Sequence, residues 1–164
     1  MPARPFVAWP DKRLRSPAAP VGDITDEIRA VWTDMIDTME AMPGVGLAAP
    51  QIGVMLRLAV VDCSAERGQA VRMADPEILS LGPDGFTWEE GSPNLPGVSA
   101  RITRPTPVEV AFTDETGARV QRVFTELWGT SVQHQIDHLE GRMYVDNLSR
   151  MKRDMLIKKA RRRG

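Results

Sequence analysis

The sequence predicts a single-domain α+β protein, and three observations support this fold class. Apolar residues recur with helical spacing after residue 25, residues 107–124 alternate as strands do, and residues 125–140 follow as a second helix. Strands and helices do not alternate strictly along the chain, as a doubly wound parallel sheet would require. The length of 164 residues is typical of one domain. We therefore expect residues 1–164 to form a single domain.

The first predicted helix begins at Thr25 and ends at Pro43-Gly44. Asp23 or Thr25 can cap its start. Its apolar side chains form one continuous stripe, opposite acidic residues, and we expect this stripe to face the core. The stripe consists of Ile28, Val31, Trp32, Met35, Ile36 and Met39.

The remaining elements follow from composition and spacing. Residues 1–22 carry five prolines and are expected to form an extended arm or loops. Residues 57–62 (RLAVVD) predict a buried strand, and residues 69–74 predict a weaker one. Residues 107–124 predict a β-hairpin because a DETG turn separates two alternating segments. Residues 125–140 predict a second helix, which ends at Gly141.

Composition excludes several classes of protein. Apolar residues make up 42% of the chain and charged residues 26%, which argues against a disordered or collagen-like protein. The single cysteine, Cys63, cannot form an internal disulfide. No segment is apolar enough to serve as a signal peptide or to span a bilayer. We expect a cytoplasmic protein with no membrane partner and no dependence on disulfides.

Residues 150–164 form a basic C-terminal segment, RMKRDMLIKKARRRG. It holds eight Lys or Arg and one Asp, although the formal net charge of the whole chain is −1. A basic tail on an acidic body suits a polyanionic partner such as RNA or the ribosome. The alternative is a solvated helix end, where basic residues also complement the helix dipole.

Both histidines of the chain lie in the segment QHQIDHL, residues 133–139. His134 and His138 are four residues apart, so on a helix they share one face and can bind one metal ion. The alternative is a pair of core histidines that are hydrogen-bonded to other groups.

Two further segments have unusual composition. Residues 44–53 (GVGLAAPQIG) lack the third glycine and the preceding strand of a dinucleotide loop, and instead suggest a closely packed backbone that presents Gln51. Residues 89–98 (EEGSPNLPGV) predict a rigid loop bounded by prolines.

These three segments, in this order, resemble the motifs of the peptide deformylase family: Gly-x-Gly-Leu-Ala-Ala-Pro-Gln, Glu-Gly-Cys-Leu-Ser and Gln-His-Glu-x-Asp-His. The resemblance runs nearly end to end, since residues 10–15, 75–78 and 138–141 also match family segments. It implies a compact fold in which antiparallel sheets surround a central helix that carries both histidines. Here a basic C-terminal helix would follow.

The resemblance also implies a reaction and its residues. The family removes the N-formyl group from the initiator methionine of nascent bacterial chains with a divalent metal, iron or zinc. By position, His134 and His138 are metal ligands and Gln51 lies on the oxyanion side. Gly46 and Leu47 belong to the substrate groove, although packing alone could also account for their segment.

Three positions depart from the family motifs. Gln135 stands at the general-base glutamate, and an amide cannot take a proton from water at neutral pH. Ser92 stands at the cysteine ligand and binds such metals weakly. Pro93 follows it and has no N–H to donate to an oxyanion. Asn94 or Glu90 could replace the lost ligand only if the loop followed a different path. Thr130 stands where the family usually has an arginine.

We therefore expect a deformylase-like protein with little or no deformylase activity, which binds N-terminal peptides of nascent chains. It would hold a divalent metal at reduced affinity or none. Two alternatives stay open. One is an active deformylase. The other is a hydrolase with altered chemistry, in which Ser92 acts with a histidine and Gln135 orients water.

Overall fold

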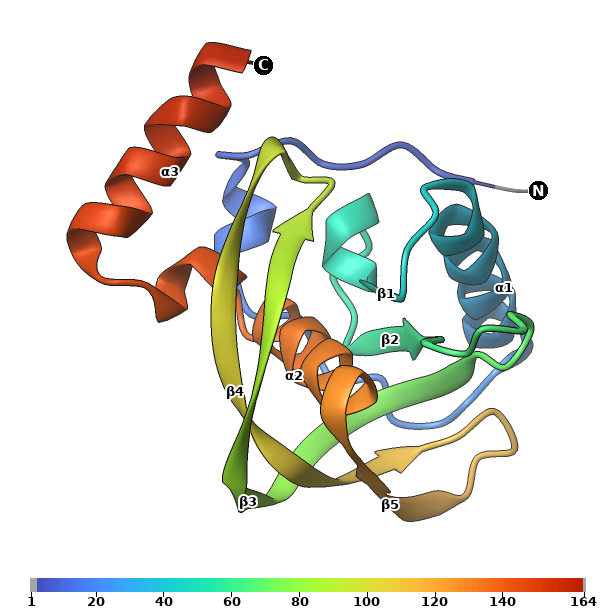
Figure 1. Cartoon of the computed structure of the whole chain (residues 1–164). Helices are drawn as coiled ribbons and strands as arrows, with labels where there is room; N and C mark the ends of the chain where they lie inside the picture. The colour runs from blue at the N-terminus through green and yellow to red at the C-terminus, as the bar shows by residue number, and fades with distance from the viewer. Residues whose placement is uncertain (1–2, 164) are drawn as a thin grey trace.

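The computed structural model describes residues 3–163 and contains one five-stranded sheet with three α-helices (Figure 1). The helices are α1 (Asp26–Ala41), α2 (Glu126–Leu139) and α3 (Arg150–Arg163). The strands are β1 (Gly46–Ala48), β2 (Leu58–Val61), β3 (Val71–Ser92), β4 (Leu95–Thr113) and β5 (Arg119–Phe124). There are also three short 3-10 helices among the described residues: η1 (Lys12–Arg15), η2 (Ala49–Ile52) and η3 (Tyr144–Asn147).

The sheet follows the order of the chain. Each strand pairs antiparallel with the next, giving β1-β2-β3-β4-β5. The long β3–β4 pair contains four register shifts, which bend a ribbon of this length. Figure 1 shows the ribbon running past α2, which occupies the centre of the molecule. The expected α+β fold with a central helix is confirmed, and the sheet is a single continuous one.

Strand β2 separates two parts of the core because successive side chains point to opposite faces. Ala59 and Val61 pack in the cluster that contains α2. Leu58 and Val60 pack in the cluster that contains α1. Both helices are therefore held against the same short strand from opposite sides.

The predicted first helix is confirmed, with Thr25 as its N-cap. The Thr25 hydroxyl accepts a hydrogen bond from the Ile28 backbone N–H at 3.3 Å. Within the predicted stripe, Trp32, Met35 and Met39 are fully buried, and the other three pack around them.

The strand predicted at residues 57–62 and the hairpin at residues 107–124 are confirmed by β2, β4 and β5, but the strands that became β3 and β4 were predicted too short. Residues 69–74 contain only the beginning of β3, which continues to Ser92. Residues 89–98 are not an independent loop, because they form the ends of β3 and β4 and the tight turn between them. Prolines at positions 93 and 96 and the exposed polar residues of this ribbon hid the strands from a periodicity argument.

The basic tail forms α3, as expected. Three of its apolar side chains, Leu156, Ile157 and Ala160, pack with residues of β4 and η3, whereas Met151 and Met155 are exposed. Most of its basic residues are exposed. No helix among residues 3–163 is long and apolar enough to cross a membrane.

Candidate functional site

A cavity of about 330 Å³ lies between the segment after α1, the end of β3 and one side of α2. Its walls carry both apolar and polar side chains. They include Val45, Trp88, Glu90, Leu127, His134 and Gln135. Three of the segments singled out from the sequence therefore meet at one place.

The two histidines lie together on α2, with ring centroids 5.0 Å apart. His134 Nδ1 is 2.9 Å from Glu90 Oε1 at the end of β3. A carboxylate can only accept, so His134 donates from Nδ1 and its Nε2 is left for another partner. His138 is almost completely buried, and neither of its ring nitrogens has a partner among the described residues.

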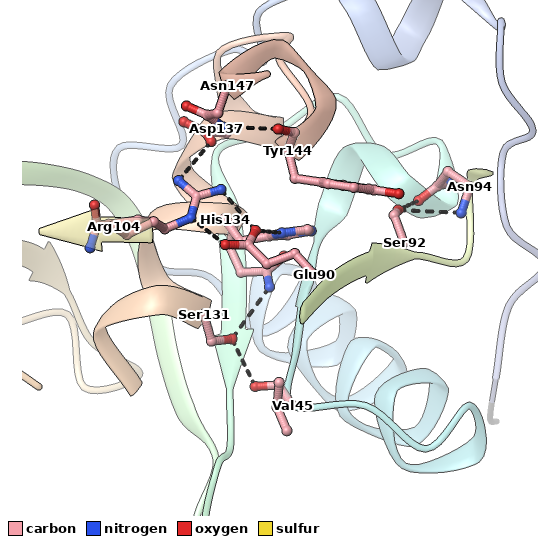
Figure 2. A network of polar contacts seen from close by, with 12 residues as sticks. Val45, Glu90, Ser92, Asn94, Arg104, Ser131, His134, Asp137, Tyr144 and Asn147 are labelled. Atoms are coloured by element: carbon pink, nitrogen blue, oxygen red, sulfur yellow. Dashed lines mark hydrogen bonds and ion pairs between the residues drawn. The ribbon is translucent and has the colours of Figure 1, made fainter. Parts of the chain in front are cut away.

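Arg104 of β4 completes a buried ionic network, shown in Figure 2. It donates to both carboxylate oxygens of Glu90, at 2.7 and 2.9 Å, and to Asp137 Oδ2 at 3.1 Å. Burial alone would raise the pKa of Glu90, but hydrogen bonds from His134 and Arg104 outweigh it and hold that pKa below its ordinary value. Glu90 is therefore a carboxylate at neutral pH.

Burial also affects the second histidine. Removal from water, together with nearby His134 and Arg104, lowers the pKa of His138 well below its ordinary value. His138 is consequently neutral at pH 7. A neutral imidazole with two unpartnered nitrogens in a buried position is suited to bind something there.

A second network occupies the turn at the end of β3. Asn94 Oδ1 accepts from Gln51 Nε2 at 2.7 Å and from the Ser92 hydroxyl at 3.1 Å. Gln51 Nε2 also donates to Ser92 Oγ at 3.3 Å, and Gln51 Oε1 accepts from the Ala48 N–H. Both amide protons of Gln51 are therefore donated to other protein groups, Asn94 and Ser92.

Gln135 lies beside Gly46 and Ser131. Its Nε2 donates to Ser131 Oγ at 3.4 Å, whereas its Oε1 is buried and has no partner among the described residues. A Cβ at Gly46 would lie 2.4 Å from both Gln135 Nε2 and Ser131 Oγ. Gly46 thus allows β1 to approach α2 closely enough to leave Gln135 beside the cavity.

A family model described as polypeptide deformylase matches residues 3–154. The chain belongs to the peptide deformylase family. It is 40% identical to a peptide deformylase of Methylocella silvestris over 97% of this chain and 84% of the relative. It is also 40% identical to a peptide deformylase-like protein of Bradyrhizobium diazoefficiens, over 97% and 93% of the two chains. The crystal structure of peptide deformylase from Ehrlichia chaffeensis is similar, with a TM-score of 0.91, 30% identity and coverage of 98% and 96%.

The residues at the family's metal position fit a metal only in part. The unpartnered nitrogens of His138 and the oriented ring of His134 suit two ligands. The third position does not, because the Ser92 hydroxyl is neutral and donates to Asn94. Within residues 3–163, no three His, Cys, Asp or Glu side chains are grouped so as to hold a metal ion. The residues present therefore do not fit the three-ligand metal centre of the family.

The other residues expected in the site are distributed between cavity and core. Gly46, Gln51, Ser92 and Pro93 line the cavity together with His134 and Gln135. Leu47 is fully buried in the cluster around α1 and does not line the cavity. Glu90 is engaged by Arg104 and His134. Asp137 accepts from Arg104.

Arg104 was missed in the sequence, and Asn94 was considered there only as a replacement ligand. Arg104 carried a usable signal, because it lies two residues after buried Ile102 on the same face of a strand and so needs a buried carboxylate partner. Asn94 carried none beyond its place in the turn, since its role depends on chain segments far away.

The Asn94 side chain joins three segments, and Asn94→Ala should therefore be strongly destabilising. Its Nδ2 donates to Val7 O at 2.5 Å and to Gln51 O at 3.0 Å, in addition to the contacts at Oδ1. Truncation leaves several buried groups unpaired, so we expect a loss of about 3 kcal/mol in the free energy of unfolding. Urea titration measures it. Asn147→Ala, which removes one partly buried hydrogen bond of an exposed side chain, is the control, and an equal loss in both variants would contradict the assignment.

The only cysteine does not replace the lost ligand. Cys63 does not line the cavity, and burial followed by the charge of Asp62 raises its pKa to about 12. Because the thiolate is the reactive form, we expect alkylation of native Cys63 by iodoacetamide at pH 8 to be more than about 100-fold slower than in the urea-unfolded chain. Mass spectrometry over time measures both rates. Similar rates would show that the thiol is accessible and ionises normally.

Proposed function

We propose that this protein is a member of the peptide deformylase family with little or no deformylase activity, which binds the N-terminal segments of peptides. The observation that carries the proposal is the network of Gln51, Ser92 and Asn94. In this network the Ser92 side chain, at the third ligand position, and the Gln51 amide, on the oxyanion side, are hydrogen-bonded to other protein groups.

Three elements of the family reaction are weakened. Gln135 cannot serve as a general base, and loss of such a group typically costs roughly 10²–10⁴-fold in rate. Pro93 offers no N–H, and loss of one oxyanion donor costs about 10²–10³-fold. The Ser92 hydroxyl leaves two good metal ligands in place of three, so a divalent iron or zinc ion would bind at reduced affinity or not at all.

A binding role is supported by what is retained. The cavity is open to solvent, and its apolar wall of Val45, Trp88 and Leu127 suits a side chain of moderate size. Family members act on N-terminal peptides of nascent chains, so such peptides are the proposed ligands. In this proposal residues 1–164 act as one domain in the cytoplasm.

The second candidate is an active deformylase. The observation in its favour is the intact half of the site, where Glu90 orients His134 and the nitrogens of His138 are unpartnered. The serine hydrolase alternative has weaker support, because the Ser92 hydroxyl donates to Asn94 and not to a histidine.

The test combines binding with turnover. The purified protein, supplied anaerobically with Fe²⁺, Ni²⁺ or Zn²⁺, is mixed with formyl-Met-Ala-Ser, and released formate and bound peptide are measured separately. We expect saturable binding without release of formate. Release at rates typical of enzymes, about 1 s⁻¹ or faster, would establish the active deformylase instead.

We also propose that α3 contacts the ribosome through its exposed basic residues. Binding to phosphates should weaken as salt rises. We expect the intact protein to pellet with ribosomes at low salt and a 1–149 truncation to lose most of this binding. Since Leu156 and Ala160 pack on the core, a charge-reversal variant, Lys152→Glu with Lys159→Glu, controls for misfolding. Equal pelleting of all three proteins would exclude the contact.

A further inference from the structure

The side chains of three residues of the cavity lining, Gln51, Ser92 and Pro93, have no free hydrogen-bond donor. Gln51 directs both amide protons to Asn94 and Ser92, and the Ser92 hydroxyl donates to Asn94. Pro93 has no N–H. The side chains of Gln51 and Ser92 therefore have no free donor for the carbonyl oxygen of a ligand. The backbone of Pro93 offers none either.

The cavity lining also includes an unpartnered acceptor, and the neighbouring hydrogen bonds show which atom it is. The Ser131 hydroxyl donates its only proton to Val45 O at 3.0 Å, so toward Gln135 it can only accept. The nitrogen of the Gln135 amide must then face Ser131, which leaves Oε1 as the free atom. Gln135 is only 4% exposed, so this acceptor is not simply hydrated by bulk water.

His134, one residue away, has its Nδ1 engaged by the Glu90 carboxylate, so this nitrogen is not a free donor either. The charge of the cavity lining also favours a ligand with hydrogen-bond donors and positive charge. Its charged residues are Glu89 and Glu90, and among the described residues no lysine or arginine lines the cavity. Arg104 balances the charge of Glu90, so Glu89 supplies the uncompensated negative charge of the lining. The site is therefore matched to a ligand that brings donors and positive charge.

From this pattern we infer that the cavity selects peptides with a free, protonated α-amino group over N-formylated peptides. An ammonium brings three N–H donors toward the unpartnered Gln135 oxygen and a positive charge toward Glu89. A formyl group would place its carbonyl oxygen among acceptors and leave the buried Gln135 oxygen with fewer partners. The inference rests on the proposed function and names the class of N-terminus that is bound.

The test compares three peptides that differ only at the amino group: Met-Ala-Ser, its N-formyl form and its N-acetyl form. Affinities are measured by calorimetry at pH 7, with and without a chelator. We expect the free amine to bind at least about tenfold more tightly than either blocked peptide, because each unsatisfied buried acceptor costs a factor of this size. The chelator should not change this ratio.

Two substitutions at Gln135 should move the ratio in opposite directions. Gln135→Met removes the acceptor with little change of shape, so the preference should disappear through weaker binding of the free amine. Gln135→Glu adds a carboxylate and should widen the preference in the presence of chelator. Gln133→Met is the matched control, since Gln133 lies on the same helix and does not line the cavity. It should keep the natural ratio.

The outcomes separate the inference from the function on which it rests. Equal or tighter binding of the formylated peptide by the natural protein would overturn the inference and leave the binding function in place. A preference that survives Gln135→Met and is not widened by Gln135→Glu would also overturn it. Failure of all three peptides to bind, or release of formate, would reject the proposed function, and the inference with it.

Discussion

Restoring the family residues at three positions, Ser92→Cys, Pro93→Leu and Gln135→Glu, should raise deformylation of formyl-Met-Ala-Ser by at least about 10⁴-fold over the natural protein. A recovered base contributes about 10²–10⁴-fold and a recovered oxyanion donor about 10²–10³-fold. The cysteine supplies the strong anionic ligand that Ser92 lacks. Initial rates of formate release, with Fe²⁺ added anaerobically, measure the effect.

The structure adds a fourth substitution to this experiment. Asn94→Ser removes the carbonyl that accepts from Gln51 at 2.7 Å and should free one amide proton for the ligand. It also removes the hydrogen bonds of Asn94 Nδ2 to Val7 O and Gln51 O, so rates are compared per folded protein, with the folded fraction measured by circular dichroism. We expect a further increase when it is added to the triple variant and no measurable activity when it is made alone. A natural protein that already works at the rate of the triple variant would show that the three losses are compensated elsewhere.

Arg104→Met should lower the free energy of unfolding by about 3–5 kcal/mol, the largest loss expected from a single substitution here. The guanidinium contacts both Glu90 and Asp137, and its side chain is only 6% exposed. Its removal leaves buried carboxylates without a counter-charge, and the cost of such a loss exceeds the net value of the ion pair itself. Urea unfolding monitored by tryptophan fluorescence measures the change.

Two further variants test this explanation. Arg101→Met makes the same change at an exposed position of β4 and should cost less than about 0.5 kcal/mol. The double variant Arg104→Met with Glu90→Gln should recover part of the loss, since no unpaired charge then remains at that position. Equal losses from Arg101→Met and Arg104→Met would mean that the network contributes nothing particular to stability.

Local pattern predicted the helices well. The stripe from Ile28 to Met39 has strict helical spacing and a capping threonine, so neighbours in sequence are also neighbours in the fold. The β3–β4 ribbon was underestimated because much of it is exposed on both faces and carries prolines, which leaves no alternation to detect. Its strands are defined by pairing with each other, which is not a property of either segment alone.

In the candidate site, too, the features set by local sequence were predicted and those set by contacts between distant segments were not. The histidine spacing on α2 indicates that His134 and His138 meet, because the helix alone sets that geometry. Whether Gln51 is free depends on Asn94, which is 43 residues away in the sequence, and on the turn that brings them together. Motif matching identifies which residues stand at a position but does not show which hydrogen bonds are already used.

The meander order of the sheet has a consequence for how the molecule forms. Each strand closes onto its predecessor in the chain, so the sheet can grow with short loops and a small entropic cost at each step. The cavity differs, because its closure needs the pair Glu90 and His134, which are 44 residues apart, and Asn94 and Val7, which are 87 apart. The cavity is thus expected to be completed late in folding and to open early in unfolding, before the sheet that supports it.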